Sequence, residues 1–351
     1  MKVLVDLSML RHPYCGLGQV ALNYGRWLGA HPQPDFDVTL LLPKEYVGAF
    51  GDGVQYLPLR NHYRFLPVGH FDVWHSIHQL SPFHPSPATI RILTIHDFNL
   101  LYYKTPAKRR RYQRLLQHEC DSARKVCFIS RFVADEAPRF LDLKGKEPIV
   151  IYNGVENLAD GPQEPPQGWC SARPFFLSMG VVTEKKNLAA LLPMMRLLPD
   201  YDLLIAGNDS SDYARRLRNE AGANVHLLGT VSDAERRWLY AHCTALLFPS
   251  LFEGFGLPVV EAMQFGKPVF CSTATSLPEV GGDVACYFQN WNPDNMAETV
   301  RQGLRDFTPE QAEGARRRAA LFSYDRHMES YFGLYRAMGD ADAQSLLSNE
   351  R

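Results

Sequence analysis

The chain has 351 residues, more than one hydrophobic core usually holds, so two domains are expected. It is 46% hydrophobic and 21% charged, and its net charge of −1 argues against a dedicated nucleic-acid binder. Seven scattered cysteines without a C-x-x-C pair favour a reduced cytoplasmic protein over a disulfide scaffold or a zinc site. Because no apolar run reaches the ~18–20 residues of a membrane span, we expect a soluble protein, or one attached at the inner face of the cytoplasmic membrane.

In the first half, short β-rich runs alternate with helical patterns, which is typical of a parallel sheet built from βα units. The predicted strands are KVLVDL (2–7), VTLLLP (38–43), VQYLPL (54–59), DVWHS (72–76), IRILTI (90–95), KVCFIS (125–130) and IVIYN (149–153). Helices are predicted at 17–30, 105–122 and 131–141. The Pro- and Gly-rich residues 161–173 are expected to form a linker.

The same alternation starts again after this linker. The predicted strands are FFLSMG (175–180), LLIAG (203–207), NVHLLG (224–229), ALLFPS (245–250), PVFC (268–271) and ACYF (285–288). Helices are predicted at about 188–198, 212–221, 232–242, 258–265 and 294–305. The pattern predicts an α/β protein with two doubly wound, Rossmann-like domains, at 1–160 and 174–322. An aromatic-rich helix at 323–338 is expected to return to the first domain, ahead of a polar tail from Gly339.

The stretch SLFEGFGLPVVEAMQFGKPV (250–269) lies at the carboxyl end of a predicted strand, where ligands bind in open α/β sheets. Pro258 suits the first turn of a short helix and Gly266 its end. The free N–H groups of that helix would form an anion site beside residues 254–257. Glu253 and Glu261 suit sugar hydroxyls better than phosphate. The alternative is that Glu253 is solvated and Glu261 only complements the helix dipole.

A second anion site is predicted in front of the helix at 188–198, for which Asn187 is a plausible N-cap. Lys185 and Lys186 stand next to this helix N-terminus, where cations are disfavoured unless an anion lies between them. We therefore favour a phosphate ligand over a solvated pair of charges.

Residues 16–21 match G-x-G-x-x-A, the fingerprint of a dinucleotide fold. The fingerprint also requires an acidic residue about 20 positions later, and no acidic residue of this chain matches that position well. An NAD(P)-dependent oxidoreductase is therefore one alternative, and a glycine loop open to another ligand is the other. His96 and Asp97 end the predicted strand 90–95, where they face a cleft or simply cap the strand.

A run of basic residues on the predicted helix 105–122 comprises Lys108, Arg109, Arg110, Arg111 and Arg114. Most such runs form a solvated face, and the alternative is a patch that meets anionic lipid or a pyrophosphate-linked acceptor. No cluster of acidic residues predicts a metal site.

Several blocks in chain order carry a family resemblance. They are CGLGQ, FDVWHS, LTIHDFNLL, FISRF, YNGV, MGVVTEKKNL, LLIAG, FPSLFEGFGLPVVEAM and SLPEVGGDVACYF. Together they resemble the retaining GT-B glycosyltransferases marked by E-x7-E. Among these, the chain is most similar to the bacterial mannosyl- and rhamnosyltransferases of O-antigen and capsule synthesis.

The resemblance implies that the first domain binds the acceptor and the second a nucleotide sugar. Glu253 would contact the donor sugar, Glu261 the ribose, and Lys186 the leaving diphosphate. His96 would lie near the reacting face of the sugar. The remaining donor-binding positions implied are Gly16, Gly18, Gly254, Phe255, Gly256 and Leu257. Many members carry an arginine where this chain has Val181, so the second phosphate charge would either come from Lys185 or be absent.

The resemblance further implies transfer of a hexose with retention of configuration, without a metal or cofactor. GDP-mannose is the leading donor, with UDP- and dTDP-sugars open, and the acceptor would be an oligosaccharide or lipid-linked precursor. The alternatives are the oxidoreductase and a catalytically inactive sugar-binding module.

Overall fold

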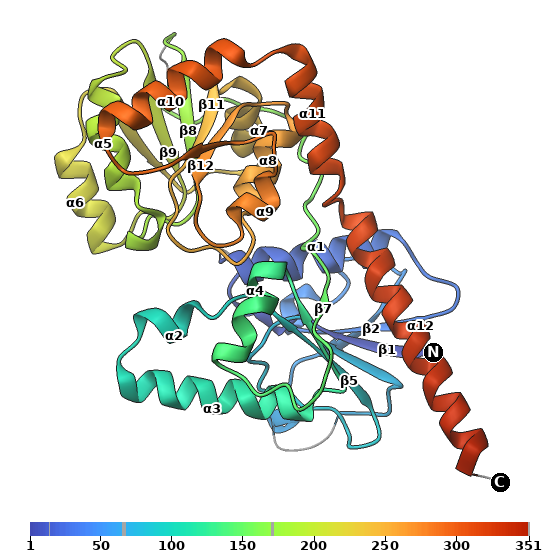
Figure 1. Ribbon diagram of the computed structural model, residues 1–351. Coiled ribbons are helices and arrows are strands. Elements are labelled where there is room, and N and C mark those ends of the chain that lie inside the picture. Colours follow the sequence, from blue (N-terminus) through green and yellow to red (C-terminus); the bar gives the residue numbers. More distant parts are fainter. Residues whose placement is uncertain (14, 65–67, 170–171, 350–351) are drawn as a thin grey trace. The chain divides into compact units, whose positions relative to one another are not determined.

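The computed structural model describes residues 1–13, 15–64, 68–169 and 172–349. Its contacts divide the chain into two compact units. Unit 1 comprises Met1–Tyr152 together with the C-terminal segment from His327, and unit 2 comprises Asn153–Arg326. Each unit contains one parallel sheet with helices on both faces, so the expected α/β class is confirmed (Figure 1).

The sheet of unit 1 has seven parallel strands in the order β3-β2-β1-β4-β5-β6-β7. These are β1 (Lys2–Asp6), β2 (Asp37–Leu42), β3 (Gln55–Pro58), β4 (Val73–Ser76), β5 (Ile90–Ile95), β6 (Lys125–Phe128) and β7 (Ile149–Val150). All seven predicted strands are confirmed. The chain moves outward from β1 to β3 and then returns to β4 on the other side of β1, so the strand order reverses between β1 and β4.

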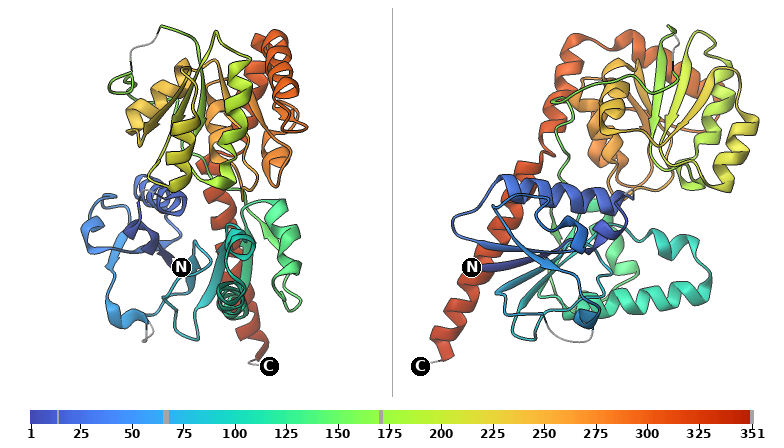
Figure 2. Two further views of the ribbon diagram at one scale, coloured as in Figure 1. Left: turned by 90° about the vertical axis from the view of Figure 1, so that its left-hand side faces the viewer. Right: turned by 180° about the vertical axis from the view of Figure 1, so that it is seen from behind.

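The three helices predicted in unit 1 are found, one of them shorter than expected, and α2 was not predicted. The set is α1 (Gly16–Ala30), α2 (Asn99–Tyr103), α3 (Pro106–Ser122), α4 (Arg131–Glu136) and α12 (Tyr324–Asn349), with 3-10 turns at Ser8–Arg11, Lys44–Tyr46, Asn61–Arg64 and Ala137–Arg139. The helix expected at 131–141 stops at Glu136 and continues as a 3-10 turn, because Pro138 supplies no N–H donor. Figure 2 shows these helices from two further sides.

From His327 onward, α12 packs in unit 1 through aromatic and histidine side chains. His327 bonds the Tyr24 hydroxyl of α1 at 2.7 Å, and His75 of β4 bonds the Tyr335 hydroxyl at 2.7 Å. The hydroxyls of Thr94 and Tyr331 are also 2.7 Å apart. The helix continues to Asn349, so the predicted end at 338 is too early.

The sheet of unit 2 has six parallel strands in the order β10-β9-β8-β11-β12-β13. These are β8 (Phe175–Met179), β9 (Asp202–Ala206), β10 (Val225–Gly229), β11 (Ala245–Phe248), β12 (Val269–Ser272) and β13 (Cys286–Phe288). All six predicted strands are confirmed. Here the order reverses between the neighbouring strands β8 and β11.

The helices of unit 2 include two that the sequence analysis missed, α9 and α11. The set is α5 (Leu191–Arg196), α6 (Asp212–Glu220), α7 (Asp233–His242), α8 (Leu257–Gln264), α9 (Leu277–Gly281), α10 (Pro293–Asp306) and α11 (Pro309–Ala320), with 3-10 turns at Glu184–Lys186 and Leu188–Ala190. A capping box of Thr308 and Gln311 starts α11, and this signal was available in the sequence.

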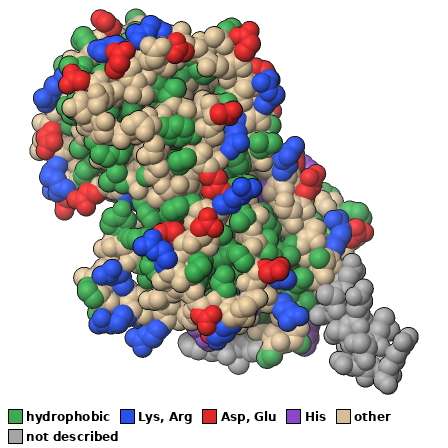
Figure 3. All heavy atoms as spheres, viewed as in Figure 1, with side chains coloured by type: hydrophobic (Ala, Val, Ile, Leu, Met, Phe, Trp, Pro, Cys, Tyr) green, Lys and Arg blue, Asp and Glu red, His purple; other side chains and the backbone are tan. Residues whose placement is uncertain are grey.

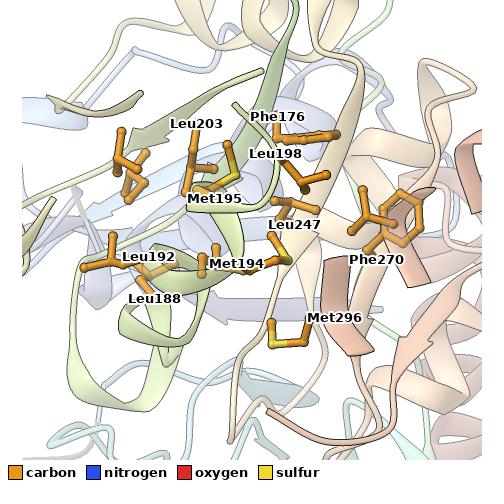
Figure 4. Close-up of a cluster of buried hydrophobic side chains, with 14 of the residues drawn as sticks. Phe176, Leu188, Leu192, Met194, Met195, Leu198, Leu203, Leu247, Phe270 and Met296 are labelled. Atoms are coloured by element: carbon orange, nitrogen blue, oxygen red, sulfur yellow. The ribbon is translucent and has the colours of Figure 1, made fainter. Parts of the chain in front are cut away.

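The core of unit 2 fixes the short helices that surround the candidate site. Phe176, Leu203 and Leu247 from the strands pack on Met194 of α5 and Met296 of α10, and all five side chains are buried (Figure 4). Because these contacts hold the sheet and helices in one arrangement, the loops at the carboxyl ends of the strands leave from fixed positions.

The expected linker at 161–173 belongs to unit 2. The amide of Glu164 donates to the Ala234 carbonyl at 3.2 Å, and that of Gln167 to the Glu235 carboxylate at 2.9 Å. The segment thus lies along α7, and the units instead meet in sequence at Tyr152–Asn153. Residues 170 and 171 lie outside the described residues. No described helix is long and apolar enough to cross a membrane.

Candidate functional site

The principal candidate site of unit 2 lies where its strand order reverses. The loops that follow β8 and β11 leave the sheet in opposite directions, which opens a crevice at the carboxyl ends of these strands. The first loop carries Lys185 and Lys186, and the second carries Glu253 and Gly254–Leu257. Seven of the eleven predicted site residues thus come from these two loops.

Lys186 and Glu253 form an ion pair across this crevice. The Lys186 Nζ atom lies 2.5 Å from Glu253 Oε1, and the two side chains are only 13% and 12% exposed. The ammonium also lies 4.7 Å from the centroid of the Phe248 ring, a cation–π contact. The Ser250 hydroxyl donates to the same Glu253 oxygen at 2.5 Å. Two candidates predicted independently are therefore brought together.

The charge of Glu253 is stabilised by its neighbours. Burial alone would raise the pKa of this carboxyl, but Lys186, Lys185 and the bond from Ser250 together lower its pKa. Glu253 is therefore ionised at neutral pH, so both of its oxygens act as hydrogen-bond acceptors. The alternative of a solvated Glu253 is wrong, because the side chain is largely buried and paired.

The backbone around Glu253 is held from both sides. The Leu251 amide donates to the Lys185 carbonyl at 2.8 Å, which ties the two loops to each other. The Ser276 hydroxyl bonds the carbonyls of Glu253 at 3.0 Å and Phe255 at 2.9 Å. The Phe255 ring is buried against Phe322, so this side chain anchors the loop and is not open to solvent.

The Lys185–Asn187 segment differs from its prediction. Asn187 has a φ of 51° and its side chain caps no helix, so the predicted N-cap is wrong. Asparagine tolerates this left-handed conformation, which turns the chain between two 3-10 turns, and α5 starts only at Leu191. Lys185 forms no ion pair with any described carboxylate, and Val181 beside Gly180 is 42% exposed.

Helix α8 starts and ends as predicted. Pro258 lies in its first turn, and no side chain caps its N-terminus. At the other end, Gly266 and Lys267 donate to the carbonyls of Met263 at 2.9 Å and Ala262 at 3.1 Å, a Schellman motif. Gly256 precedes the helix with φ of 107°, and a Cβ there would meet Leu277 at 2.7 Å.

Glu261 is almost fully enclosed, with 4% of its side chain exposed. Its Oε1 atom accepts a hydrogen bond from Arg236, and its Oε2 atom accepts one from the Tyr240 hydroxyl at 2.6 Å. Although burial acts the other way, the Glu261 charge raises the pKa of Arg236. Burial and the same charge raise the pKa of Tyr240.

Sequence reasoning missed both partners of Glu261. Arg236 and Tyr240 are four residues apart on α7, so they share one helix face. A carboxylate accepts about four hydrogen bonds, and these two residues supply two of them. The alternative in which Glu261 serves only the helix dipole is incomplete, because its carboxylate pairs with this arginine.

In unit 1 the glycine loop follows β1 at the reversal between β1 and β4. Gly16 is the first residue of α1, and a Cβ added there meets no atom within 4 Å. At Gly18 a Cβ would lie 2.1 Å from the His12 carbonyl oxygen, so this position requires glycine. The G-x-G starts ten residues after the end of β1 at Asp6, whereas the dinucleotide fingerprint follows its strand in a tight turn.

His96 follows β5 and is 6% exposed. Its Nε2 atom donates to the Ile77 carbonyl at 2.7 Å, which leaves Nδ1 as an acceptor, and its amide donates to the Gln79 side chain at 3.1 Å. Burial lowers the pKa of His96 to about 4, so the ring is neutral at pH 7. The sequence analysis did not predict Gln79 as a partner of His96, because Gln79 lies in the loop after β4 and not directly at a strand end.

All five basic residues of the predicted run are exposed on α3. None of Lys108, Arg109, Arg110, Arg111 and Arg114 forms an ion pair within the part of the chain that the structure describes. In Figure 3, Lys and Arg side chains gather over the region of unit 1 that α3 occupies in Figure 1.

Comparison with known families identifies the domain that holds the Lys186–Glu253 pair. Residues 163–320 match the family of glycosyl transferases group 1. These residues form a glycosyltransferase group 1 domain. The oxidoreductase alternative is therefore wrong, in agreement with the distance between β1 and Gly16.

Curated relatives extend the similarity of this glycosyltransferase beyond the matched domain. The O-antigen chain mannosyltransferase B of Escherichia coli is 28% identical over 274 residues, 70% of each chain. The O-antigen chain mannosyltransferase RfbU of Salmonella typhimurium is 30% identical over 58% of this chain and 57% of its own. The D-rhamnosyltransferase WbpZ of Pseudomonas aeruginosa is 32% identical over 41% and 39%.

Solved structures show the fold of the glycosyltransferase. Sucrose-phosphate synthase of Thermosynechococcus elongatus has a TM-score of 0.75 at 17% identity, over 97% of this chain and all of that one. HepE of Anabaena, solved with UDP-glucose, has a TM-score of 0.69 at 16% identity, over 99% and 100%. The GT-B fold expected from the sequence is confirmed.

Proposed function

We propose that the protein transfers a hexose from a nucleotide-diphosphate sugar to a glycan or lipid-linked acceptor in surface polysaccharide synthesis. The transfer retains the anomeric configuration and requires no metal. The observation that carries the proposal is the Lys186–Glu253 pair at the reversal point of unit 2. It combines a cation for phosphate with an ionised acceptor for hydroxyls in one crevice.

The donor diphosphate would lie against Lys186 and Lys185. Lys185 has no described carboxylate partner, so its charge remains available, and it takes the place of the arginine that Val181 replaces. The uncapped start of α8 at Leu257 supplies N–H groups to the same anion. These groups stabilise the leaving diphosphate as negative charge develops on it.

The donor sugar would lie on the backbone of Gly254–Gly256 with its hydroxyls bound to Glu253. The ribose hydroxyls would bind to Glu261, while Arg236 and Tyr240 hold its carboxylate. The two glutamates then recognise the two ends of the donor.

In the reaction, the bond between the sugar C1 and the diphosphate oxygen breaks, and a bond from C1 to the acceptor oxygen forms on the same face. The acceptor hydroxyl proton passes to the leaving diphosphate. In unit 1, His96 is neutral at pH 7, and its Nδ1 atom can accept a hydrogen bond from a ligand hydroxyl. Gly16 and Gly18, which lie in the first turn of α1, would contact the donor or the acceptor.

The relatives support mannose as the transferred sugar. Two of them are O-antigen chain mannosyltransferases, similar over more than half of this chain. GDP-mannose is therefore the leading donor.

The basic face of α3 supports contact with an anionic membrane, where a lipid-linked acceptor would be found. Leu115 of α3 is 46% exposed, and Leu100 and Tyr103 of the preceding helix α2 are 36% and 59% exposed. Cations near an anionic surface contribute about 1 kcal/mol each, and exposed apolar side chains insert at the interface. Sedimentation with vesicles of anionic lipid, but not with phosphatidylcholine vesicles, is expected.

The function is tested by calorimetry with GDP, UDP, dTDP and ADP, followed by transfer assays with the sugar of the nucleotide bound. NMR of the product identifies the anomeric configuration, and EDTA leaves the rate unchanged. The alternative of an inactive sugar-binding module predicts donor binding without transfer or hydrolysis for any acceptor mixture. Binding of no nucleotide contradicts the proposal.

A further inference from the structure

The loop between β12 and α9 contains a strained residue. Thr275 has a φ of 56°, in the left-handed region. Among the described residues, Lys144 and Asn187 are the other non-glycine positions with positive φ, and Thr275 alone is β-branched. A β-branched side chain clashes with its own backbone there, so such residues are rare outliers. They persist where the surrounding structure imposes the conformation.

The Thr275 side chain has one described use. Its Oγ1 atom accepts the Glu253 amide at 3.0 Å, while the Glu253 carbonyl accepts the hydroxyl of the next residue, Ser276, at 3.0 Å. Two consecutive residues of this loop therefore fix both backbone groups of Glu253. The residue is half-exposed, so burial in the core does not explain it.

Glycine would adopt this backbone without strain, but it has no oxygen to accept the Glu253 amide. Ser276 bonds only the Glu253 carbonyl, so without the Thr275 oxygen the Glu253 amide loses the hydrogen bond that orients it. The Glu253 carboxylate must also meet Lys186 and Ser250 at 2.5 Å each. A small rotation of the backbone would move it away from both.

We propose that Thr275 is a positioning residue for donor-sugar recognition: its hydroxyl holds Glu253 in the orientation that binds the sugar, at the cost of local strain. The inference rests on the proposed role of Glu253. It predicts that Thr275 affects recognition of the sugar and not of the nucleotide, which Lys185, Lys186 and Glu261 bind.

The test compares affinities for three pairs of probes: GDP with GDP-mannose, UDP with UDP-glucose, and dTDP with dTDP-rhamnose. The pair that the wild-type protein binds most tightly is then used with Thr275→Gly, Thr275→Val and Thr275→Ser. Thr273→Gly is the matched control, since Thr273 is an exposed residue of the same loop. Each variant is also combined with Glu253→Ala.

Thr275→Gly and Thr275→Val are expected to weaken binding of the nucleotide sugar about tenfold relative to the nucleoside diphosphate, the effect of losing one hydrogen bond that orients a charged group. Thr275→Ser and Thr273→Gly keep the wild-type ratio. Thr275→Gly melts no lower than the wild type, because the strain is relieved. In the Glu253→Ala background the Thr275 substitutions have no further effect.

Wild-type binding of none of the six probes would overturn the proposed function and this inference together. With nucleotide binding established, an unchanged ratio in Thr275→Gly and Thr275→Val overturns the inference alone. So does an equal loss in Thr275→Ser, or a loss of folding in Thr275→Gly. Additive effects in the Glu253→Ala background likewise show that Thr275 acts elsewhere.

Discussion

Lys186 Nζ and Glu253 Oε1 are 2.5 Å apart although their residues follow different strands of unit 2. The pair joins the loop after β8 to the loop after β11, and both side chains are largely buried. Removal of one partner leaves a buried charge without compensation. A substitution of either residue is therefore expected to destabilise unit 2 as well as to change the charge of the candidate donor site.

Lys186→Ala and Glu253→Ala are each expected to reduce sugar transfer at least about a hundredfold, equivalent to about 2.7 kcal/mol of transition-state stabilisation. The measurement is kcat/KM for transfer, with circular dichroism to establish folding. Arg216→Ala is the matched control, because Arg216 and Glu184 form an exposed pair 2.9 Å apart in the same unit. Near-native transfer in both site variants contradicts the proposed roles.

The charge of Glu253 gives a pH dependence of defined sign. Its pKa in the folded protein lies below its ordinary value of 4.5. The stabilising contribution of the ion pair is therefore complete above pH 4.5 and is lost as the pH falls through the lowered pKa. Urea unfolding of the wild type and of Glu253→Gln between pH 7 and pH 3 measures it. Parallel pH curves for the two proteins contradict the prediction.

Buried histidines are expected to destabilise unit 1 at a higher pH than the pH at which Glu253 is protonated. Burial lowers the pKa of both His96 and His327 to about 4, and lowers that of His75 well below its ordinary value. The unfolded chain binds these protons near pH 6.5, so stability is complete above pH 6.5 and falls as the pH decreases toward 4. In His327→Gln, the slope of unfolding free energy against pH is expected to be shallower by up to about 1.4 kcal/mol per pH unit. His31→Gln is the control, because His31 is exposed.

Arg236→Met leaves the Glu261 carboxylate without its cation. We expect a loss of unfolding free energy on the order of 3 kcal/mol, because the carboxylate is almost fully buried. Glu261→Gln separates the proposed ribose contact from this structural role. It is expected to reduce the preference for a ribonucleotide over its 2′-deoxy analogue, measured by calorimetry. An unchanged preference excludes Glu261 from ribose binding.

Two glycines of the same loop are expected to differ. Gly18→Ala forces a Cβ to within 2.1 Å of the His12 carbonyl oxygen, so the loop must move and stability falls. Gly16→Ala meets no atom within 4 Å, and unfolding measurements should show wild-type stability or better. A loss of transfer in Gly16→Ala then indicates that a ligand approaches this glycine. Equal stability of both variants contradicts the prediction.

The strands and the donor loops were predictable because each depends on local pattern. Apolar runs separated by helical segments predicted the two parallel sheets, and Pro258 and Gly266 correctly delimited α8. The order of the strands was not predictable, so the meeting of Lys186 with Glu253 was visible only in the structure. Arg236 and Tyr240 escaped notice because their partner, Glu261, lies on another helix.

The errors also have physical causes. Asn187 was expected at a helix N-cap from propensity alone, yet the same side chain tolerates the left-handed turn that it adopts. The segment 161–173 was expected to be a linker from its composition, but its amides bond to α7. A Pro- and Gly-rich composition predicts a segment without helix or strand, but it does not predict whether that segment packs against a domain.

The C-terminal helix determines when unit 1 can complete its fold during synthesis. Tyr331 and Tyr335 bond to Thr94 and His75 of unit 1, yet all of unit 2 is synthesised between these two sets of residues. During synthesis, the polar side chains of β4 and β5 therefore lack their tyrosine partners until the C-terminal helix has left the ribosome. A fragment ending at Tyr152 would carry that uncovered sheet face permanently, and we expect it to aggregate.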